Sequence, residues 1–317
     1  MTGGPVPSLG QWAAPPAPEP GEPEEARPGP AATTPSIARM HNYYLGGKDN
    51  YAADREAADD ALLKAPAMSR LAQAGRAFLE HAAGRLAAAD GLRQFVDIGC
   101  GLPVPSGRTC DGAGDVTDPW TEPGTDDGTI YGTGLRASGR CTGGIADVVR
   151  RADPSCRVAY VDNDPMVVCH ARALLAVDAG TRAVDADLRE PAALLAHPEL
   201  RQLIDLGRPV GVLLGGVLQF LTDGEDPRGI VAALANGLPP GSRIVLTHAV
   251  RTPEMEAVSA LHDDAGVPFT PRGRDEIAAL CGDLHIDAGH PVNLPVAEGA
   301  DGAGPLPLVG CVARKAE

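Results

Sequence analysis

Apolar residues follow two alternating rhythms from residue 94 to the end of the chain. Short apolar runs rich in β-branched residues are typical of strands, and apolar side chains at every third or fourth position are typical of helices. Strands are predicted at 94–98, 157–161, 182–185, 209–214, 242–248, 291–297 and 307–313. Helices are predicted at 144–151, 165–177, 190–200, 228–237, 253–264 and 273–281. This alternation predicts an α/β fold, with a mostly parallel sheet between two layers of helices.

Two further helices are predicted before the first strand. The second begins near Ser69, a residue type that commonly caps helix N-termini, and Leu71, Phe78 and Leu86 recur on one of its faces. At the other end of the chain, a short glycine-rich link at 298–304 joins the last two strands. Such a short link favours a hairpin, so one strand is predicted to run antiparallel to the rest.

Three segments depart from this alternation. Residues 1–35 contain ten prolines and no periodic pattern, which predicts a disordered tail because they cannot bury enough surface to offset the entropy of ordering. Residues 104–142 contain eight glycines and only four Leu, Ile, Val or Phe residues, which predicts an insertion loop. The polar and aromatic segment 36–51 is interpreted either as a capping segment on the core or as a lid over a ligand. One domain is therefore predicted over 36–317, with a helical N-terminal cap at 36–93.

Composition narrows the class of partner. The net charge is −15, whereas proteins that grip nucleic acid need a basic surface, so a small-molecule substrate is favoured over nucleic acid. No apolar run reaches the roughly 18 residues of a membrane span, and no signal-peptide pattern opens the chain, so a cytoplasmic location without membrane contact is predicted. The seven cysteines are scattered and form no Cys-x-x-Cys pair, so no metal site is predicted.

The first stretch that indicates chemistry is FVDIGCGLP at 95–103. A strand ends at Asp97, and Gly99 and Gly101 allow a tight turn and close approach of a ligand to the backbone. Taken alone, this pattern also fits an ordinary turn between a strand and a helix. The third glycine of the dinucleotide-binding pattern is missing and Pro103 stands nearby, which disfavours a nicotinamide cofactor.

The second stretch is VAYVDNDP at 158–165, where Asp162 ends an apolar strand. A carboxylate at this place can accept hydrogen bonds from both ribose hydroxyls of a nucleoside. Asp162 follows Gly101 by 61 residues, or by 22 without the 39 residues of 104–142, close to the spacing of about 20 in nucleotide-binding units. Asp164 and Pro165 are predicted to cap and begin the next helix.

Two later stretches add candidates at the same sheet edge. In AVDADLREP at 183–191, Asp187 is placed to accept from an adenine amino group and Leu188 to offer its backbone N–H, although a loop or helix-capping aspartate has the same appearance. The strand at 209–214 runs into Gly215, where open α/β sheets bind ligands, and Gln219 follows as a polar group that can face a substrate.

Together these stretches resemble the class I methyltransferases that use S-adenosylmethionine, and more narrowly an actinobacterial S-adenosyl methyltransferase family once described as a domain of unknown function. The resemblance rests on SIARMHNYYLGGKDNYAADR (36–55), FVDIGCGLP, YVDNDP, DLREP, the strand within 209–223, LTHA (246–249) and FTPRGRDEI (269–277). It implies a Rossmann-like three-layer sandwich with a mostly parallel seven-stranded sheet whose last strand is antiparallel. The cofactor contacts it implies are Asp97, Gly99, Gly101, Asp162, Asn163, Asp187, Leu188 and Gly215, with Tyr44, Lys48 and Asn50 near the cofactor.

The function that follows is methyl transfer from S-adenosylmethionine to a small molecule. Because the sulfonium is an activated donor, a base is needed only if the acceptor must lose a proton, and His41, Tyr43 and His248 are the candidates. One alternative is a nicotinamide-dependent oxidoreductase, which the missing glycine and the absent Tyr-x-x-x-Lys pair disfavour. The other is a non-catalytic cofactor-binding homologue, suggested by the interruption of the glycine loop at 104–142.

Overall fold

The computed structural model describes residues 33–104, 144–264, 267–294 and 305–316. The tail predicted at 1–35 and the insertion loop predicted at 104–142 therefore fall almost entirely outside the described residues. Within the described part, α3 is the longest helix, with 21 residues. Neither it nor any other described helix combines the length and apolar character that crossing a membrane requires.

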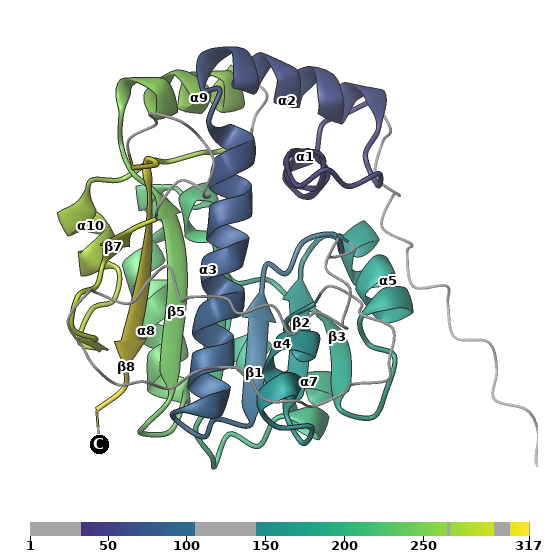
Figure 1. Cartoon of the computed structure of the whole chain (residues 1–317), viewed down its shortest axis with the longest axis vertical. Coiled ribbons are helices and arrows are strands. Elements are labelled where there is room, and N and C mark those ends of the chain that lie inside the picture. The colour runs from purple at the N-terminus through teal and green to yellow at the C-terminus, as the bar shows by residue number, and fades with distance from the viewer. Residues whose placement is uncertain (1–32, 105–143, 265–266, 295–304, 317) are drawn as a thin grey trace, which may run out of the picture.

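The described strands form one sheet (Figure 1). In spatial order they are β3 (Thr181–Asp185), β2 (Arg157–Asp162), β1 (Gln94–Ile98), β4 (Gly211–Gly215), β5 (Arg243–Ala249), β8 (Leu308–Arg314) and β6 (His285–Ile286), with β7 (Val292–Asn293) also paired to β8. Strands β1 to β5 pair in parallel, and β8 runs antiparallel to β5, β6 and β7. The predicted mostly parallel sheet with a reversed last strand is confirmed.

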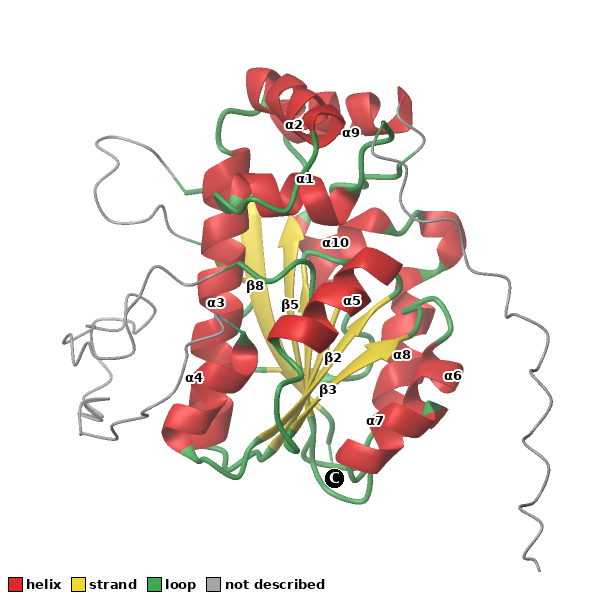
Figure 2. Ribbon diagram, turned by 90° about the vertical axis from the view of Figure 1, so that its right-hand side faces the viewer, coloured by secondary structure: helices red, strands yellow, loops and turns green. Residues whose placement is uncertain are grey.

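Helices cover both faces of this sheet (Figure 2). On one face lie α3 (Met68–Ala88), α4 (Ile145–Ala152) and α5 (Pro165–Leu174), and on the other lie α6 (Pro191–Ala196), α7 (Pro198–Leu203), α8 (Pro227–Gly237) and α10 (Arg274–Ala279). Because side chains alternate along a strand, Phe95 joins the first core and its neighbour Val96 joins the second. The predicted three-layer arrangement follows from this alternation.

Three elements differ in detail from the predictions. Within its described residues, 291–294, the strand predicted at 291–297 contains β7, and the two-residue β6, too short to leave a periodic signal, brings the described strands to eight. The helix predicted at 190–200 is divided into α6 and α7, because the residue before a proline is disfavoured from helical geometry and His197 before Pro198 is extended. Helix α3 begins at Met68, so Ser69 lies within it and Ala67 takes the N-cap position.

A helical cap lies beyond the carboxyl ends of the parallel strands, consisting of α1 (Ile37–Tyr44) and α2 (Ala52–Lys64), with α9 (Pro253–Asp264) beside α2 (Figure 1). Its two helices are joined by a buried ion pair, in which Arg39 Nε lies 2.6 Å from Asp54 Oδ2 and the side chains are 1% and 0% exposed. Asp54 also accepts hydrogen bonds from the backbone N–H groups of Ser36 and Tyr51. The carboxylate of Asp54 therefore connects α1 and α2 to each other and to the residues that precede each helix.

Candidate functional site

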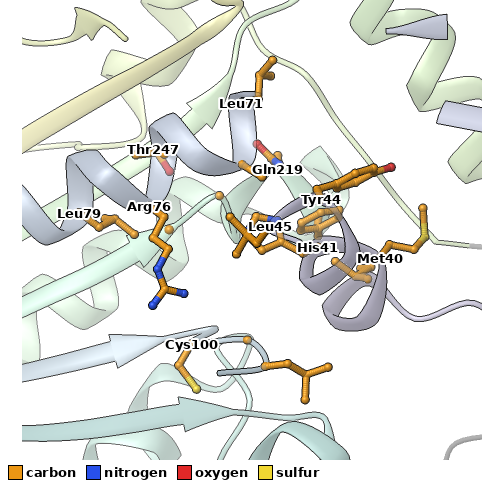
Figure 3. A pocket seen from close by; sticks show the side chains of 18 of the residues that line it. Met40, His41, Tyr44, Leu45, Leu71, Arg76, Leu79, Cys100, Gln219 and Thr247 are labelled. Carbon is orange, nitrogen blue, oxygen red and sulfur yellow. The ribbon is translucent and has the colours of Figure 1, made fainter. Parts of the chain in front are cut away.

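A pocket opens between the cap and the carboxyl edge of the sheet (Figure 3). Its walls come from α1, α3, the loop after β1, the ends of β4 and β5, the 3-10 helix η1 (Leu218–Phe220) and α9. Its volume is about 1220 Å³ when the space open to solvent is counted. Open α/β sheets bind ligands at this edge, so the pocket lies where the fold places its ligand site.

The glycine loop after β1 forms one wall of the pocket. Gly99 and Gly101 have φ of +69° and +66°, in the left-handed region that side chains other than glycine rarely adopt. A Cβ atom on Gly99 would lie 2.8 Å from Cγ2 of Val217, whereas one on Gly101 would meet no atom within 4 Å. The backbone at Gly101 therefore faces open space, as a loop that receives a ligand requires.

Asp97 and Asp162 flank this loop from the ends of β1 and β2. Asp162 Oδ2 accepts a hydrogen bond from the backbone N–H of Gly101 at 3.1 Å, and its Oδ1 accepts from that of Asp164 at 3.0 Å. Burial raises the pKa of Asp162 to about 6. Burial also raises the pKa of Asp97, which lines the pocket, to about 7, although the positive charge of Arg76 opposes the shift. Asp97 thus lines the pocket, whereas Asp162 lies outside its lining and holds the glycine loop through Gly101.

Asp164 has the structural role that its position predicts. It is the N-cap of α5, its side chain accepts from the backbone N–H of Met166 at 2.8 Å, and Pro165 follows at the first helical position. The N-cap prediction is confirmed. Capping by Asp164 leaves the neighbouring Asp162 as the carboxylate beside the glycine loop.

Asn163 and Asp187 lie at the same sheet edge but outside the lining of the pocket. The Asn163 amide Nδ2 donates to Asp187 Oδ2 at 2.9 Å, and Asp187 Oδ1 accepts from the backbone N–H of Arg189 at 2.8 Å. The side chain of Leu188 is buried in the core on the α6 side of the sheet. The structure therefore brings Asn163 and Asp187 together at the ends of β2 and β3, next to the strand that carries Asp162.

Arg76 and Glu80 on α3 also line the pocket, and neither is among the residues predicted from the sequence. They lie one helical turn apart, with Arg76 Nε 2.9 Å from Glu80 Oε1. Figure 3 shows the Arg76 side chain pointing from α3 toward the loop at Cys100. A pair of opposite charges four residues apart was the available sequence signal, but such pairs are common on solvated helix faces. The structure adds a cation and an anion to the cavity at the end that holds Asp97.

The cap contributes His41 and Tyr44 to the pocket. Surrounding protein and the charge of Arg76 lower the pKa of His41 to about 4, although its side chain remains accessible from the open pocket space, so its imidazole is neutral near neutral pH. Tyr43 lies on another face of α1, where its hydroxyl donates to Asp59 Oδ1 at 3.0 Å. Among the three predicted proton acceptors, His41 is thus the one that lines the cavity.

The remaining predicted residues of the cap and of β5 lie outside the pocket lining. Asn50 Nδ2 donates to Asn42 Oδ1 and to the carbonyl oxygen of Gly47, and neither Asn50 nor Lys48 lines the pocket. His248 is fully buried, with Nδ1 2.9 Å from the Ala249 carbonyl oxygen and Nε2 3.0 Å from Arg272 Nη1. These contacts stabilise the loop after α1 and the end of β5.

At the end of β4, Gly215 and Gln219 line the pocket. A Cβ atom on Gly215 would collide with Cδ1 of Leu79 on α3, so a larger residue there would require the Leu79 side chain to shift. The Gln219 side-chain oxygen accepts from the backbone N–H of Ala249 at 2.9 Å, which ties η1 to β5. In the described part of the chain, no three His, Cys, Asp or Glu side chains come close enough together to hold a metal ion.

Comparison with known proteins places this site in a family. The family described as S-adenosyl methyltransferase matches residues 24–107 and 124–292, which make up most of the chain. The residues between these two matches, 108–123, lie inside the predicted insertion loop. None of the curated proteins compared with the chain matches it.

Two crystal structures share the architecture. A duf574 family protein from Streptomyces avermitilis is 30% identical, covers 89% of this chain and 98% of its own length, and gives a TM-score of 0.72. A provisionally named methyltransferase from Thermobifida fusca is 29% identical, covers 90% of this chain and 96% of its own length, and also gives a TM-score of 0.72. The match therefore extends over nearly the whole of both relatives.

Proposed function

Because the chain belongs to the S-adenosyl methyltransferase family, we propose that it moves the methyl group of S-adenosylmethionine to a small molecule bound in the pocket beneath α1. The observation that carries the proposal is the carboxylate of Asp162 at the glycine loop, held by the N–H groups of Gly101 and Asp164. The net charge of −15 supports a small molecule over nucleic acid as acceptor.

We infer that S-adenosylmethionine binds with its adenosine part at the ends of β2 and β3 and its amino acid end in the pocket. Asp162 would accept hydrogen bonds from the ribose hydroxyls, and Asp187 together with the backbone N–H of Leu188 would face the adenine. The cofactor's amino acid end carries a carboxylate and an ammonium group. The pocket offers Arg76 for the first, and Glu80 and Asp97 for the second. Burial raises the pKa of Asp97 to about 7, so this carboxyl group gains a cationic partner when the ammonium group arrives.

The bound cofactor supplies the activated methyl group, so the protein's own task is to position the acceptor, exclude water and receive a proton. His41 is the group that we assign to the last task, because its neutral imidazole lines the cavity. Tyr43 and His248 make their contacts outside the pocket lining. A nicotinamide-dependent oxidoreductase is disfavoured by the family assignment.

Isothermal titration of the full chain with S-adenosylmethionine tests the proposal. We expect one site per chain, filled by S-adenosylmethionine and by S-adenosylhomocysteine, and no heat from NADH at the same concentration. Binding of NADH without binding of S-adenosylmethionine would instead support an oxidoreductase. Cofactor binding with no methyl transfer to any of a broad set of small molecules would favour the non-catalytic homologue.

Replacing Arg76 with alanine should weaken binding of S-adenosylmethionine by about tenfold to 100-fold, because one hydrogen bond to a charged group contributes roughly 1.5–3 kcal/mol. Binding of 5′-methylthioadenosine, which has no amino acid end, should be unchanged. The matched control is Arg85→Ala on the exposed side of α3, which should affect neither ligand. If Arg76→Ala weakens both ligands equally, Arg76 supports the shape of the pocket and does not bind the carboxylate.

A further inference from the structure

One side of the pocket is built from aromatic rings. Phe220 of η1, His262 of α9 and Phe269 after α9 all line the cavity, and we call them the aromatic wall. Their ring centroids lie 5.2 Å apart for His262 and Phe269, 5.8 Å for the two phenylalanines and 6.2 Å for Phe220 and His262. These separations suit offset or edge-to-face contacts, so a further ring can join the cluster.

The chain has few aromatic residues with which to build such a wall. It contains four phenylalanines in 317 residues, and two of them, Phe220 and Phe269, are here. The other two, Phe78 of α3 and Phe95 of β1, are buried in the core between helix and sheet. Two segments that lie far along the chain from the glycine loop therefore bring half of the chain's phenylalanines to one cavity.

Charge in the pocket is confined to the opposite side. Arg76, Glu80 and Asp97 are the charged side chains among the described residues that line the cavity, and all three come from α3 and β1. The aromatic wall and the facing part of α1 contribute apolar groups and two histidines, His41 and His262. Burial lowers the pKa of His262, and the surrounding protein and the charge of Arg76 lower the pKa of His41, so this side of the pocket offers no countercharge near neutral pH. A charged acceptor would lose its hydration here without gaining a partner.

His262 has a polar atom that needs a partner. The residue is 7% exposed, and its Nδ1 is buried without a hydrogen-bond partner in the described structure. Buried nitrogen atoms are normally paired, since leaving one unpaired is unfavourable. Because His262 lines the pocket, a ligand lying against the aromatic wall can supply the missing partner.

We propose that the methyl acceptor is an uncharged aromatic small molecule, whose ring packs on Phe220 and Phe269 and whose O–H or N–H group hydrogen-bonds to Nδ1 of His262. The inference rests on the proposed function, because it assumes that the cofactor occupies the end of the pocket with Arg76 and Asp97. The apolar side chains of Met40 on α1 and of Leu45 directly after it then cover the ring from the cap.

The test uses 2-naphthol as probe, added to the full chain saturated with S-adenosylhomocysteine. Two comparison ligands isolate each property: 2-naphthoate has the same rings and a negative charge, and decahydro-2-naphthol has the hydroxyl group without aromatic rings. We expect 2-naphthol to bind at least about tenfold more tightly than either. Equal or tighter binding of 2-naphthoate or of the saturated alcohol would overturn the proposal.

Two variants assign the contacts. Phe269→Leu keeps the apolar surface and removes the ring, and should weaken 2-naphthol binding about threefold to tenfold. His262→Phe keeps a ring and removes Nδ1, and should weaken 2-naphthol but leave naphthalene unchanged, whereas the control His285→Phe, on an exposed residue, should change neither. Unchanged 2-naphthol binding in both pocket variants would contradict the inference. If S-adenosylhomocysteine binds the chain and 2-naphthol does not, only the acceptor class is wrong; if neither S-adenosylmethionine nor S-adenosylhomocysteine binds, the proposed function itself fails.

Discussion

Replacing Asp162 with alanine should raise the dissociation constant for S-adenosylmethionine by roughly 100-fold or more. In the proposed function the carboxylate accepts two hydrogen bonds from the ribose, and losing hydrogen bonds to a charged group costs about 3 kcal/mol in total even when water partly replaces them. The substitution also leaves the N–H groups of Gly101 and Asp164 without their acceptor, which loosens the glycine loop. Isothermal titration measures the change.

Two comparisons separate direct contact from loop distortion. The control Asp153→Ala removes a carboxylate that pairs with Arg93 at 2.7 Å at the opposite sheet edge, and should leave the dissociation constant unchanged. An analogue of S-adenosylhomocysteine without ribose hydroxyls should bind the wild type more weakly than the parent compound, yet bind Asp162→Ala about as well as the parent does. If the variant still distinguishes the two compounds as strongly as the wild type, Asp162 does not contact the ribose.

The pH dependence of binding gives a second readout of the same contact. Burial raises the pKa of Asp162 to about 6 in the free chain, so the carboxyl group is protonated below that pH and must lose its proton to accept from the ribose. Affinity should therefore fall as the pH falls through about 6, approaching tenfold per pH unit for this one group. Because alanine cannot titrate, the difference between wild type and Asp162→Ala should shrink near about pH 5.

The pairing of Gly101 with Asp162 could be predicted from the sequence because it depends on features that are local to two strands. Neighbouring parallel strands end at the same edge, and the register that places Asp97 beside Tyr160 brings Asp162 to the glycine loop. The spacing revealed this once residues 104–142 were set aside. The contact at 3.1 Å between Gly101 N and Asp162 Oδ2 shows the two stretches meeting as the spacing indicates.

His248 shows what strand position alone cannot decide. It lies near the end of β5 at the correct edge, but side chains alternate along a strand. Thr247 and Ala249 line the pocket, so His248 between them points to the other face, where Arg272 lies against it. Whether the odd-numbered or the even-numbered residues of β5 face the ligand depends on which helices cover each face of the sheet. That is a property of the assembled tertiary structure.

Arg76 and the aromatic wall escaped prediction for a related reason. Helical periodicity identifies the buried face of α3. It does not predict that the part of α3 that carries Arg76 borders a pocket that Asp97 also lines. Phe220, His262 and Phe269 come from three segments with no shared motif, and only the packing of α9 against the cap brings them together. Residues on α1 follow the same rule, since His41 and Tyr44 are one turn apart and share a face that Tyr43 does not.

Replacing Asp54 with alanine should destabilise the cap by about 3–5 kcal/mol, the usual cost of removing one partner of a buried ion pair. Arg39 would remain 1% exposed without its counterion, and the N–H groups of Ser36 and Tyr51 would lose their acceptor. Asp60→Ala on the exposed face of α2 is the matched control and should change stability by less than about 0.5 kcal/mol. Hydrogen exchange of α1 and α2 amides measures the loss even if the cap opens separately from the sheet.

The same variant also links the cap to function and to pH. Burial alone would raise the pKa of Asp54, but the hydrogen bonds from Arg39, Tyr51 and Ser36 outweigh it and hold the pKa below its usual range. The stabilisation is therefore present above the pKa of the unfolded chain, near about 4, and is lost as the pH falls through the lower folded value, so the cost of Asp54→Ala should shrink in acid. Because α1 carries His41 and Tyr44, an opened cap should abolish methyl transfer while binding of 5′-methylthioadenosine at the sheet edge persists. Equal protection of the α1 amides in variant and wild type would show that the ion pair does not hold the cap.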